Sequence, residues 1–299
     1  MKKKKNKRTT VLLVVLLLAG LSLLLYPTVS DYWNSFHQTR AIASYAETVA
    51  ELDNTQYDAL WEAARHYNEA LARRNSAFIL SKAQKKEYES LLDVSGLGVM
   101  GYVEIPEINC SLPIYHGTEE SVLQIAVGHI EWSSLPVGGE SSHCVISGHR
   151  GLPSAKLFTN LDKLIEGDTF MLRVLDEVLT YEVDQILIVE PQETSPLKIE
   201  EGKDYCTLVT CTPYGVNSHR LLVRGHRIPY AQQEATIQER EALPVTESTW
   251  LRQYGKGIRL GLLFLAVPLL LALTGWLRRK WQGHKLYGGR GGRFAKKKK

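Results

Sequence analysis

Hydrophobic and polar positions divide the 299-residue chain into two apolar runs near its ends, a helical segment and a long region of short strands. Residues 11–26 read VLLVVLLLAGLSLLLY without a charge, and residues 258–277 are almost as apolar. Because a bilayer core takes about 20 apolar residues, within a range of roughly 17–25, the second run predicts a transmembrane helix. The first run predicts a transmembrane helix or signal anchor, with a cleaved signal peptide as the alternative.

Between these runs, residues 31–93 have the spacing of helices. Apolar side chains recur three, four and seven positions apart over residues 57–71, which is typical of a helix with one packed face. The sequence Ser-Lys-Ala-Gln at residues 81–84 matches a capping box and opens a second helix. A non-periodic connector that contains Phe78 joins the two helices. We expect the apolar stripe to pack against the protein rather than to bind a ligand.

From residue 95 onward the pattern changes to short β-rich runs. The sequence Ser-Gly-Leu-Gly at residues 95–98 ends the helical segment, and seven β-rich runs follow before residue 230. Gly, Pro, Asn and Asp separate these runs, as they do at the ends of short strands. The pattern predicts a mainly β domain of about 130 residues, either a sandwich or a closed barrel.

Charge is distributed unevenly along the chain. Six of the first eight residues are Lys or Arg, and the tail from residue 278 carries ten basic side chains and no acid. All 32 Asp and Glu residues lie in the middle, which is therefore acidic although the net charge is +4. Since Lys and Arg beside membrane spans stay on the cytoplasmic side, we expect both termini inside the cell and the middle outside it. This topology explains the basic ends, and we expect no nucleic-acid partner.

Two β-rich runs near the end of this region predict a hairpin that could carry catalytic side chains. TLVTC at residues 207–211 and RLLVRG at residues 220–225 enclose a segment rich in turn residues. An antiparallel hairpin would place Cys211 beside Arg220. A thiol next to a guanidinium can act as a nucleophile with an anion stabiliser, but the chemistry also needs a base.

Among nine histidines, His149 has the most informative position. It follows an apolar strand-like run and precedes a loop with glycine and proline, and catalytic groups are commonly held at such strand ends. With Cys211 and Arg220, it would complete a set of acid/base, nucleophile and oxyanion stabiliser. We expect the other histidines of the β region to be structural or surface residues: His116, His129, His143, His219 and His226.

The other cysteines of the chain, Cys110, Cys144 and Cys206, are expected to be buried thiols. Cys206 and Cys211 lie five positions apart on one predicted strand, so they face opposite sides and cannot pair there. The chain has no Cys-x-x-Cys pattern, and we predict neither a metal site nor a cofactor.

Three segments closely resemble the class C, or pilin-polymerising, sortases of Gram-positive bacteria. They read YHGTEESVLQIAVGHIEWSSLPVGG, SGHRGLPSAKLF and TLVTCTPYGVNSHRLLVRG, and the resemblance covers roughly residues 95–230. It implies a sortase-type eight-stranded β-barrel with N-terminal helices and flanking transmembrane helices. It also implies a cysteine transpeptidase with Cys211 as nucleophile, His149 as general acid/base, and Arg220 as stabiliser of negative charge on the substrate carbonyl.

The resemblance further implies the reaction and its partners. Cys211 would attack the Thr–Gly bond of an LPxTG-like sorting signal, and His149 would protonate the leaving amine as a thioester forms. An acceptor lysine of a second pilin would then attack the thioester, giving an isopeptide bond between subunits. Two alternatives stay open: a sortase that anchors proteins to the cell wall, and a non-catalytic protein that binds sorting signals.

The chain departs from the family pattern in its lid. Class C sortases usually carry a lid over the active site, anchored by an Asp-Pro-aromatic motif, and this chain has no Asp-Pro dipeptide. Phe78 is the candidate for the aromatic position, but the carboxylate that would face the arginine is missing. We therefore expect a lid that is atypical, loosely held or absent.

The predicted organisation places a membrane-anchored catalytic domain on the extracellular face of the cell membrane. Its parts are a basic cytoplasmic N-terminus (1–10), a first apolar span (11–26), a helical N-terminal and lid region (27–94), the catalytic barrel (95–230), a linker (231–257), a second span (258–277) and a basic cytoplasmic tail (278–299).

Overall fold

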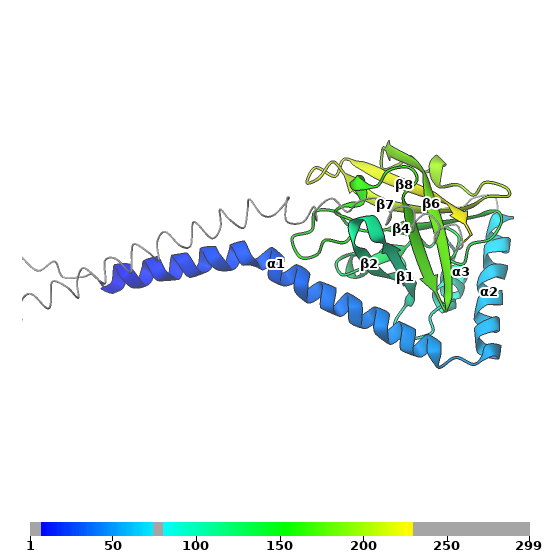
Figure 1. The fold of residues 1–299 in the computed structure, drawn as a ribbon, viewed down its shortest axis with the longest axis horizontal. Coiled ribbons are helices and arrows are strands. Elements are labelled where there is room, and N and C mark those ends of the chain that lie inside the picture. Colours follow the sequence, from blue (N-terminus) through cyan, green and yellow to red (C-terminus); the bar gives the residue numbers. More distant parts are fainter. Residues whose placement is uncertain (1–6, 74–79, 230–299) are drawn as a thin grey trace, which may run out of the picture. The chain divides into compact units, whose positions relative to one another are not determined.

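The computed structural model describes residues 7–73 and 80–229, with side chains from residue 11 onward. Three helices precede a domain of strands (Figure 1): α1 (Lys7–Ala50), α2 (Asn54–Ala72) and α3 (Lys82–Ser90). The connector with Phe78, the predicted linker, the second span and the basic tail all lie outside the described residues.

Eight strands close into one barrel, in the order β1-β2-β3-β4-β7-β8-β6-β5. Neighbours in the barrel are antiparallel except for the parallel pairs β2–β3 and β4–β7. This closed barrel confirms the fold that the resemblance implies. The strands are β1 (Val99–Ile105), β2 (Cys110–His116), β3 (Val127–His129), β4 (Ser142–Ser147), β5 (Thr169–Val174), β6 (Glu177–Val189), β7 (Asp204–Thr212) and β8 (His219–Ile228); short helices lie at α4 (Glu120–Leu123), η1 (Pro106–Ile108), η2 (Leu161–Lys163) and η3 (Ser195–Leu197).

The strand that the hydrophobic pattern misses is β3. It has only three residues, too few for an alternating pattern to be recognised. Its neighbours define it instead, because Val127 pairs with Ile114 of β2 and Gly128 pairs with Ser147 of β4. A tertiary contact rather than a local preference therefore makes this segment a strand.

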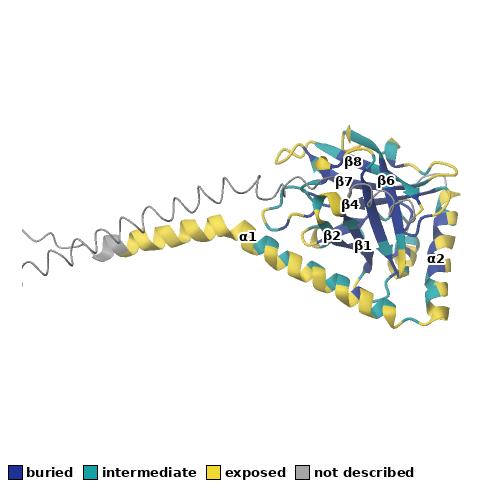
Figure 2. Ribbon diagram, viewed as in Figure 1, coloured by how far each residue is buried: buried dark blue, intermediate teal, exposed yellow. Residues whose placement is uncertain are grey.

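Apolar side chains from nearly every strand fill the core, which Figure 2 shows as dark blue ribbon. Val103, Ile114, Ile146, Phe170 and Leu208 have no exposed surface and come from five different strands. Burying a large apolar side chain contributes about 1.5–3 kcal/mol relative to leaving it in water. The core thus fixes the strands whose ends carry the candidate site.

Helix α1 runs without interruption through Pro27, so the predicted boundary between the first span and the helical region is not a helix end. A proline removes one hydrogen bond from a helix interior, and a long helix can continue past it. In the described part of the chain, α1 is the one helix long and apolar enough to cross a membrane. Its apolar half is exposed (Figure 2), which is consistent with a membrane anchor.

The N-terminal helices are bonded to the barrel by buried polar groups. The Tyr45 hydroxyl of α1 donates to the carbonyl of Met100 at 3.0 Å and accepts from the N–H of Leu175 at 2.7 Å. The Asn68 amide of α2 exchanges two hydrogen bonds with the backbone of Leu135, at 2.7 and 3.1 Å. The predicted stripe of α2 is therefore a packing face.

Helix α3 begins at the predicted capping box, in which Ser81 and Gln84 satisfy each other's backbone N–H groups. Its Tyr88 is buried, and the Tyr88 hydroxyl bonds to His129 Nδ1 at 2.9 Å and accepts from the N–H of Gly117 at 3.0 Å. His129 is fully buried in this network, as expected for a structural histidine.

Candidate active site

The hairpin predicted around Cys211 forms in the structure. β7 and β8 pair antiparallel in a register that sets Cys211 opposite Arg220. Gly215 and Asn217 adopt positive φ angles of 76° and 60° in the turn, a conformation that glycine and asparagine tolerate best. Cys211, near the end of β7, is partly exposed, whereas Cys206 of the same strand is buried.

The parallel pairing of β4 with β7 positions His149. Ser147, the last residue of β4, lies opposite Val209. The N–H of Gly148 donates to the carbonyl of Val209 at 3.0 Å, which completes this last pair of the two strands. His149 follows Ser147 by two residues, as Cys211 follows Val209, so the same register, continued past the end of β4, would set His149 level with Cys211. The three candidate residues thus lie at the ends of three successive strands of the barrel.

The main chain on both sides of His149 is fixed by hydrogen bonds. The buried Thr210 hydroxyl donates to the carbonyl of Gly148 at 2.8 Å. The N–H of Phe158 donates to the carbonyl of His149 itself at 3.1 Å. Bonds of this kind hold a functional side chain in one orientation on a rigid support.

The His149 ring has a carboxylate neighbour that sequence reasoning missed. The His149 side chain is 28% exposed, and its Nε2 is buried without a hydrogen bond to any described residue. Oε2 of Glu120 lies 3.8 Å from this nitrogen, beyond hydrogen-bond distance but close enough to place a negative charge beside the ring. Glu120 belongs to α4, far from His149 in the sequence, and no local pattern connects the two.

The Arg220 side chain is held over its own turn. Its Nη1 donates to the carbonyl of Asn217 at 3.3 Å and to that of His219 at 3.1 Å. Nε and Nη2 make no hydrogen bond with another residue in the described part of the chain. Because a guanidinium carries five N–H donors, Arg220 keeps several of them for an anion at this end of the barrel.

The remaining cysteines are free thiols. Cys144 and Cys206 are buried and face each other across the parallel β4–β7 pair. The residue Cys110 as a whole is partly exposed. Its thiol is shielded from water, and this burial raises the pKa of the thiol to about 12. In the ranges that the structure describes, no group of three His, Cys, Asp or Glu side chains is arranged to hold a metal ion.

Helix α1 contacts the loop that follows His149. Asp31 accepts from the N–H of Lys156 at 2.9 Å and pairs with the ammonium of the same lysine at 3.2 Å. The Asn34 amide donates to the carbonyl of Ser154 at 2.9 Å. The residues just beyond the apolar half of α1 therefore support the loop that carries the candidate base.

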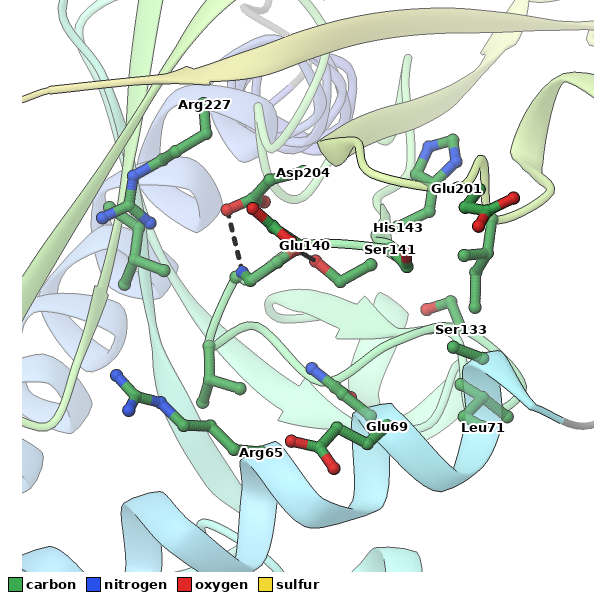
Figure 3. A pocket seen from close by; sticks show the side chains of 18 of the residues that line it. Arg65, Glu69, Leu71, Ser133, Glu140, Ser141, His143, Glu201, Asp204 and Arg227 are labelled. Atoms are coloured by element: carbon green, nitrogen blue, oxygen red, sulfur yellow. Dashed lines mark hydrogen bonds between the residues drawn. The ribbon is translucent and has the colours of Figure 1, made fainter.

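A cavity of about 1490 Å³ lies at the other end of β7 and β8 (Figure 3). Asp204 at the start of β7 and Arg227 near the end of β8 line it, and α2 forms one wall. Arg73 and Leu80, the described residues on either side of the predicted lid connector, line it as well. Both flanks of the connector therefore lie at the end of the barrel away from Cys211.

Comparison with known proteins gives consistent matches. The sortase domain family matches residues 103–228. Sortase D of Bacillus subtilis is 32% identical over 169 residues, which cover 56% of this chain and 79% of that protein. Sortase C1 of Streptococcus agalactiae, a crystal structure, shares 50% identity at a TM-score of 0.63, over 64% of this chain and 98% of that one. Clostridium perfringens sortase C, solved with a C-terminal cell wall sorting motif, shares 43% identity at a TM-score of 0.56, over 64% of this chain and 99% of that one.

A closed barrel that carries a cysteine opposite an arginine at one end, together with these matches, defines a cysteine transpeptidase. The chain belongs to the sortase family, whose members act on LPxTG-type motifs. Both of these solved structural neighbours are class C sortases. The resemblance carried by the three sequence segments is therefore confirmed.

Proposed function

We propose that this sortase joins pilin subunits by isopeptide bonds at the outer face of the cell membrane. The observation that carries the proposal is the β7–β8 register that sets Cys211 opposite Arg220. The parallel β4–β7 register supports it, because β4 ends two residues before His149 and opposite Val209. Sortase C of Streptococcus pneumoniae, a structural neighbour at 46% identity whose structure bears on pilin substrate specificity, supports pilins as the substrates. The neighbour solved with a sorting motif supports an LPxTG-like signal.

The first half-reaction forms an acyl-enzyme. The thiolate of Cys211 attacks the carbonyl carbon of the Thr–Gly bond in the sorting signal, and the carbonyl oxygen becomes negative. The guanidinium of Arg220 stabilises this oxygen. The C–N bond then breaks, His149 gives its proton to the leaving amine, and a thioester remains on Cys211.

The second half-reaction transfers the acyl group. The side-chain amine of a lysine on a second pilin attacks the thioester, and His149 takes the proton that this amine loses. The C–S bond breaks, Cys211 leaves as the thiolate that began the cycle, and an isopeptide bond links the two subunits. Water competes with the lysine, so slow hydrolysis is the expected side reaction.

The location of the reaction rests on α1 and on the charge pattern. The apolar half of α1 would anchor the enzyme, and the basic residues that precede it would keep the N-terminus in the cytoplasm. The contacts of α1 with the loop after His149 would hold the catalytic end of the barrel close to the anchor. A second span at 258–277 would return the C-terminus to the cytoplasm.

The experiment incubates the full-length enzyme in membranes with a purified pilin that carries an LPxTG-like signal and an acceptor lysine. We expect a ladder of covalent multimers, lost in Cys211→Ala. Hydrolysis or transfer to a glycine-type amine without a ladder would favour the cell-wall-anchoring alternative. Binding of the signal without cleavage or a covalent intermediate would favour the non-catalytic alternative.

A further inference from the structure

Arg150 directly follows His149 and has no part in the proposed chemistry. Its side chain is only 10% exposed, and its guanidinium forms an ion pair with Asp162 of the short η2 turn. It also lies 5.8 Å from the centre of the Tyr214 ring, within the range of a cation–π interaction. Nη1 makes a further, long hydrogen bond of 3.4 Å to the hydroxyl of Thr212.

These contacts join the three strand ends of the candidate site. Thr212 directly follows Cys211 on β7, and Tyr214 lies in the turn that leads to Arg220. One buried side chain thus links the residue after the candidate base with the residue after the candidate nucleophile. A planar guanidinium suits this task because it presents several donors in a fixed geometry.

We propose that Arg150 is a positioning residue that holds His149 at its working distance from Cys211 by tying the His149 loop to the end of β7. The inference rests on the proposed function, since it takes His149 as the acid/base and Cys211 as the nucleophile. Geometry of this kind matters because a displacement of about 1 Å in a catalytic group can cost on the order of 10²-fold in rate.

Stability alone does not account for an arginine at this position. Nε of Arg150 is buried and makes no hydrogen bond with any residue in the described ranges, and an unsatisfied buried donor costs free energy. The ion pair itself adds little stability, because the Asp162 side chain is 43% exposed and solvent-exposed ion pairs contribute about 0–1 kcal/mol. The contacts of this arginine are better explained by the geometry that it imposes on the loop.

Arg224 on β8 provides a matched control within the same barrel. Its side chain is 15% exposed and pairs with Asp184, with Nε 3.0 Å from the carboxylate. It lies 4.1 Å from the centre of the Tyr205 ring, so it has the same kinds of partner as Arg150. These partners are on β6 and at the start of β7, away from the loop that carries His149.

The test compares Arg150→Met, Arg150→Lys and Arg224→Met in the full-length enzyme with an LPxTG peptide as substrate. We expect Arg150→Met to lower kcat on the order of 10²-fold with little change in KM, since orientation rather than binding is lost. Arg150→Lys should recover part of this loss, because a lysine keeps the positive charge but lacks the planar set of N–H donors of a guanidinium. Arg224→Met should lower Tm while kcat per folded molecule stays at the wild-type value.

Three outcomes would overturn the inference. They are a wild-type kcat in folded Arg150→Met, equal kcat losses in Arg150→Met and Arg224→Met, and a loss that appears only in KM. If Arg150→Met does not fold, the kcat values of Arg150→Lys and Asp162→Asn serve as the test. An unchanged kcat in both variants would reject the positioning role. A wild-type enzyme that never cleaves the peptide would instead refute the proposed function, and the inference with it.

Discussion

The hydroxyl of Thr210 holds the carbonyl just before His149, and Thr210→Val removes that bond with little change in volume. Thr210 is 1% exposed, and its hydroxyl donates to the Gly148 carbonyl at 2.8 Å. The variant leaves a buried carbonyl without its donor, which costs about 1–3 kcal/mol. In a domain of roughly 150–250 residues, each kcal/mol lowers Tm by about 2–4 °C. We expect a decrease in Tm of about 2–12 °C, measured by calorimetry.

The same variant should also impair catalysis. The bond from Thr210 ties β7 to the residue before His149, so its loss frees the base relative to Cys211. We expect kcat for cleavage of an LPxTG peptide to fall roughly tenfold, with KM little changed, because the reacting groups are less well oriented.

Thr207 on the same strand supplies the matched control. It is also 1% exposed, and its hydroxyl bonds to Nε2 of His143 at 2.7 Å, near the other end of β4. We expect Thr207→Val to lower Tm by a similar amount and to leave kcat unchanged. A wild-type kcat in Thr210→Val, or equal kcat losses in the two variants, would refute the reasoning.

The remaining predictions concern the helices, pH and the connector. Tyr88→Phe removes the hydroxyl bonded to His129 and should cost about 1–3 kcal/mol in urea unfolding, whereas an unchanged midpoint would show that α3 is held by other contacts. Burial lowers the pKa of His116 and His143 below 6.5 in the folded protein. As the pH falls, these histidines therefore take up protons more readily in the unfolded chain than in the folded one. Stability should therefore decrease from about pH 6.5 downward, and a flat profile in denaturant titrations would contradict this. Phe78→Ala should leave peptide cleavage close to the wild-type rate, because the described flanks of the connector lie away from Cys211, and a large gain would reveal an effective lid.

The part of the site that is local in the sequence could be predicted from it. The hairpin that pairs Cys211 with Arg220 depends on two β-rich runs and the turn residues between them, and all of these are visible in one short segment. The capping box at residues 81–84 was predictable for the same reason. In both cases neighbouring residues carry the whole signal.

The part that depends on non-local pairing could not be predicted in this way. The end of β4, two residues before His149, lies beside β7 only because the two strands pair in parallel, although about sixty residues separate them, and parallel pairing has no local turn signal. The strand-end position makes His149 a candidate base, but the local pattern does not predict which strand lies beside it, and the resemblance assigns its role. The contacts of Glu120 with His149 and of Asp162 with Arg150 could not be predicted for the same reason, because each joins separate elements of the fold.

The most direct test of the account is the mass of the enzyme after a short incubation with an LPxTG peptide and an acid quench. The account predicts an added acyl group that maps to Cys211 and disappears when a lysine or another amine is supplied. The adduct should be absent in Cys211→Ala and greatly reduced in His149→Ala and Arg220→Ala. Peptide turnover without an adduct, or an adduct on another cysteine, would contradict it.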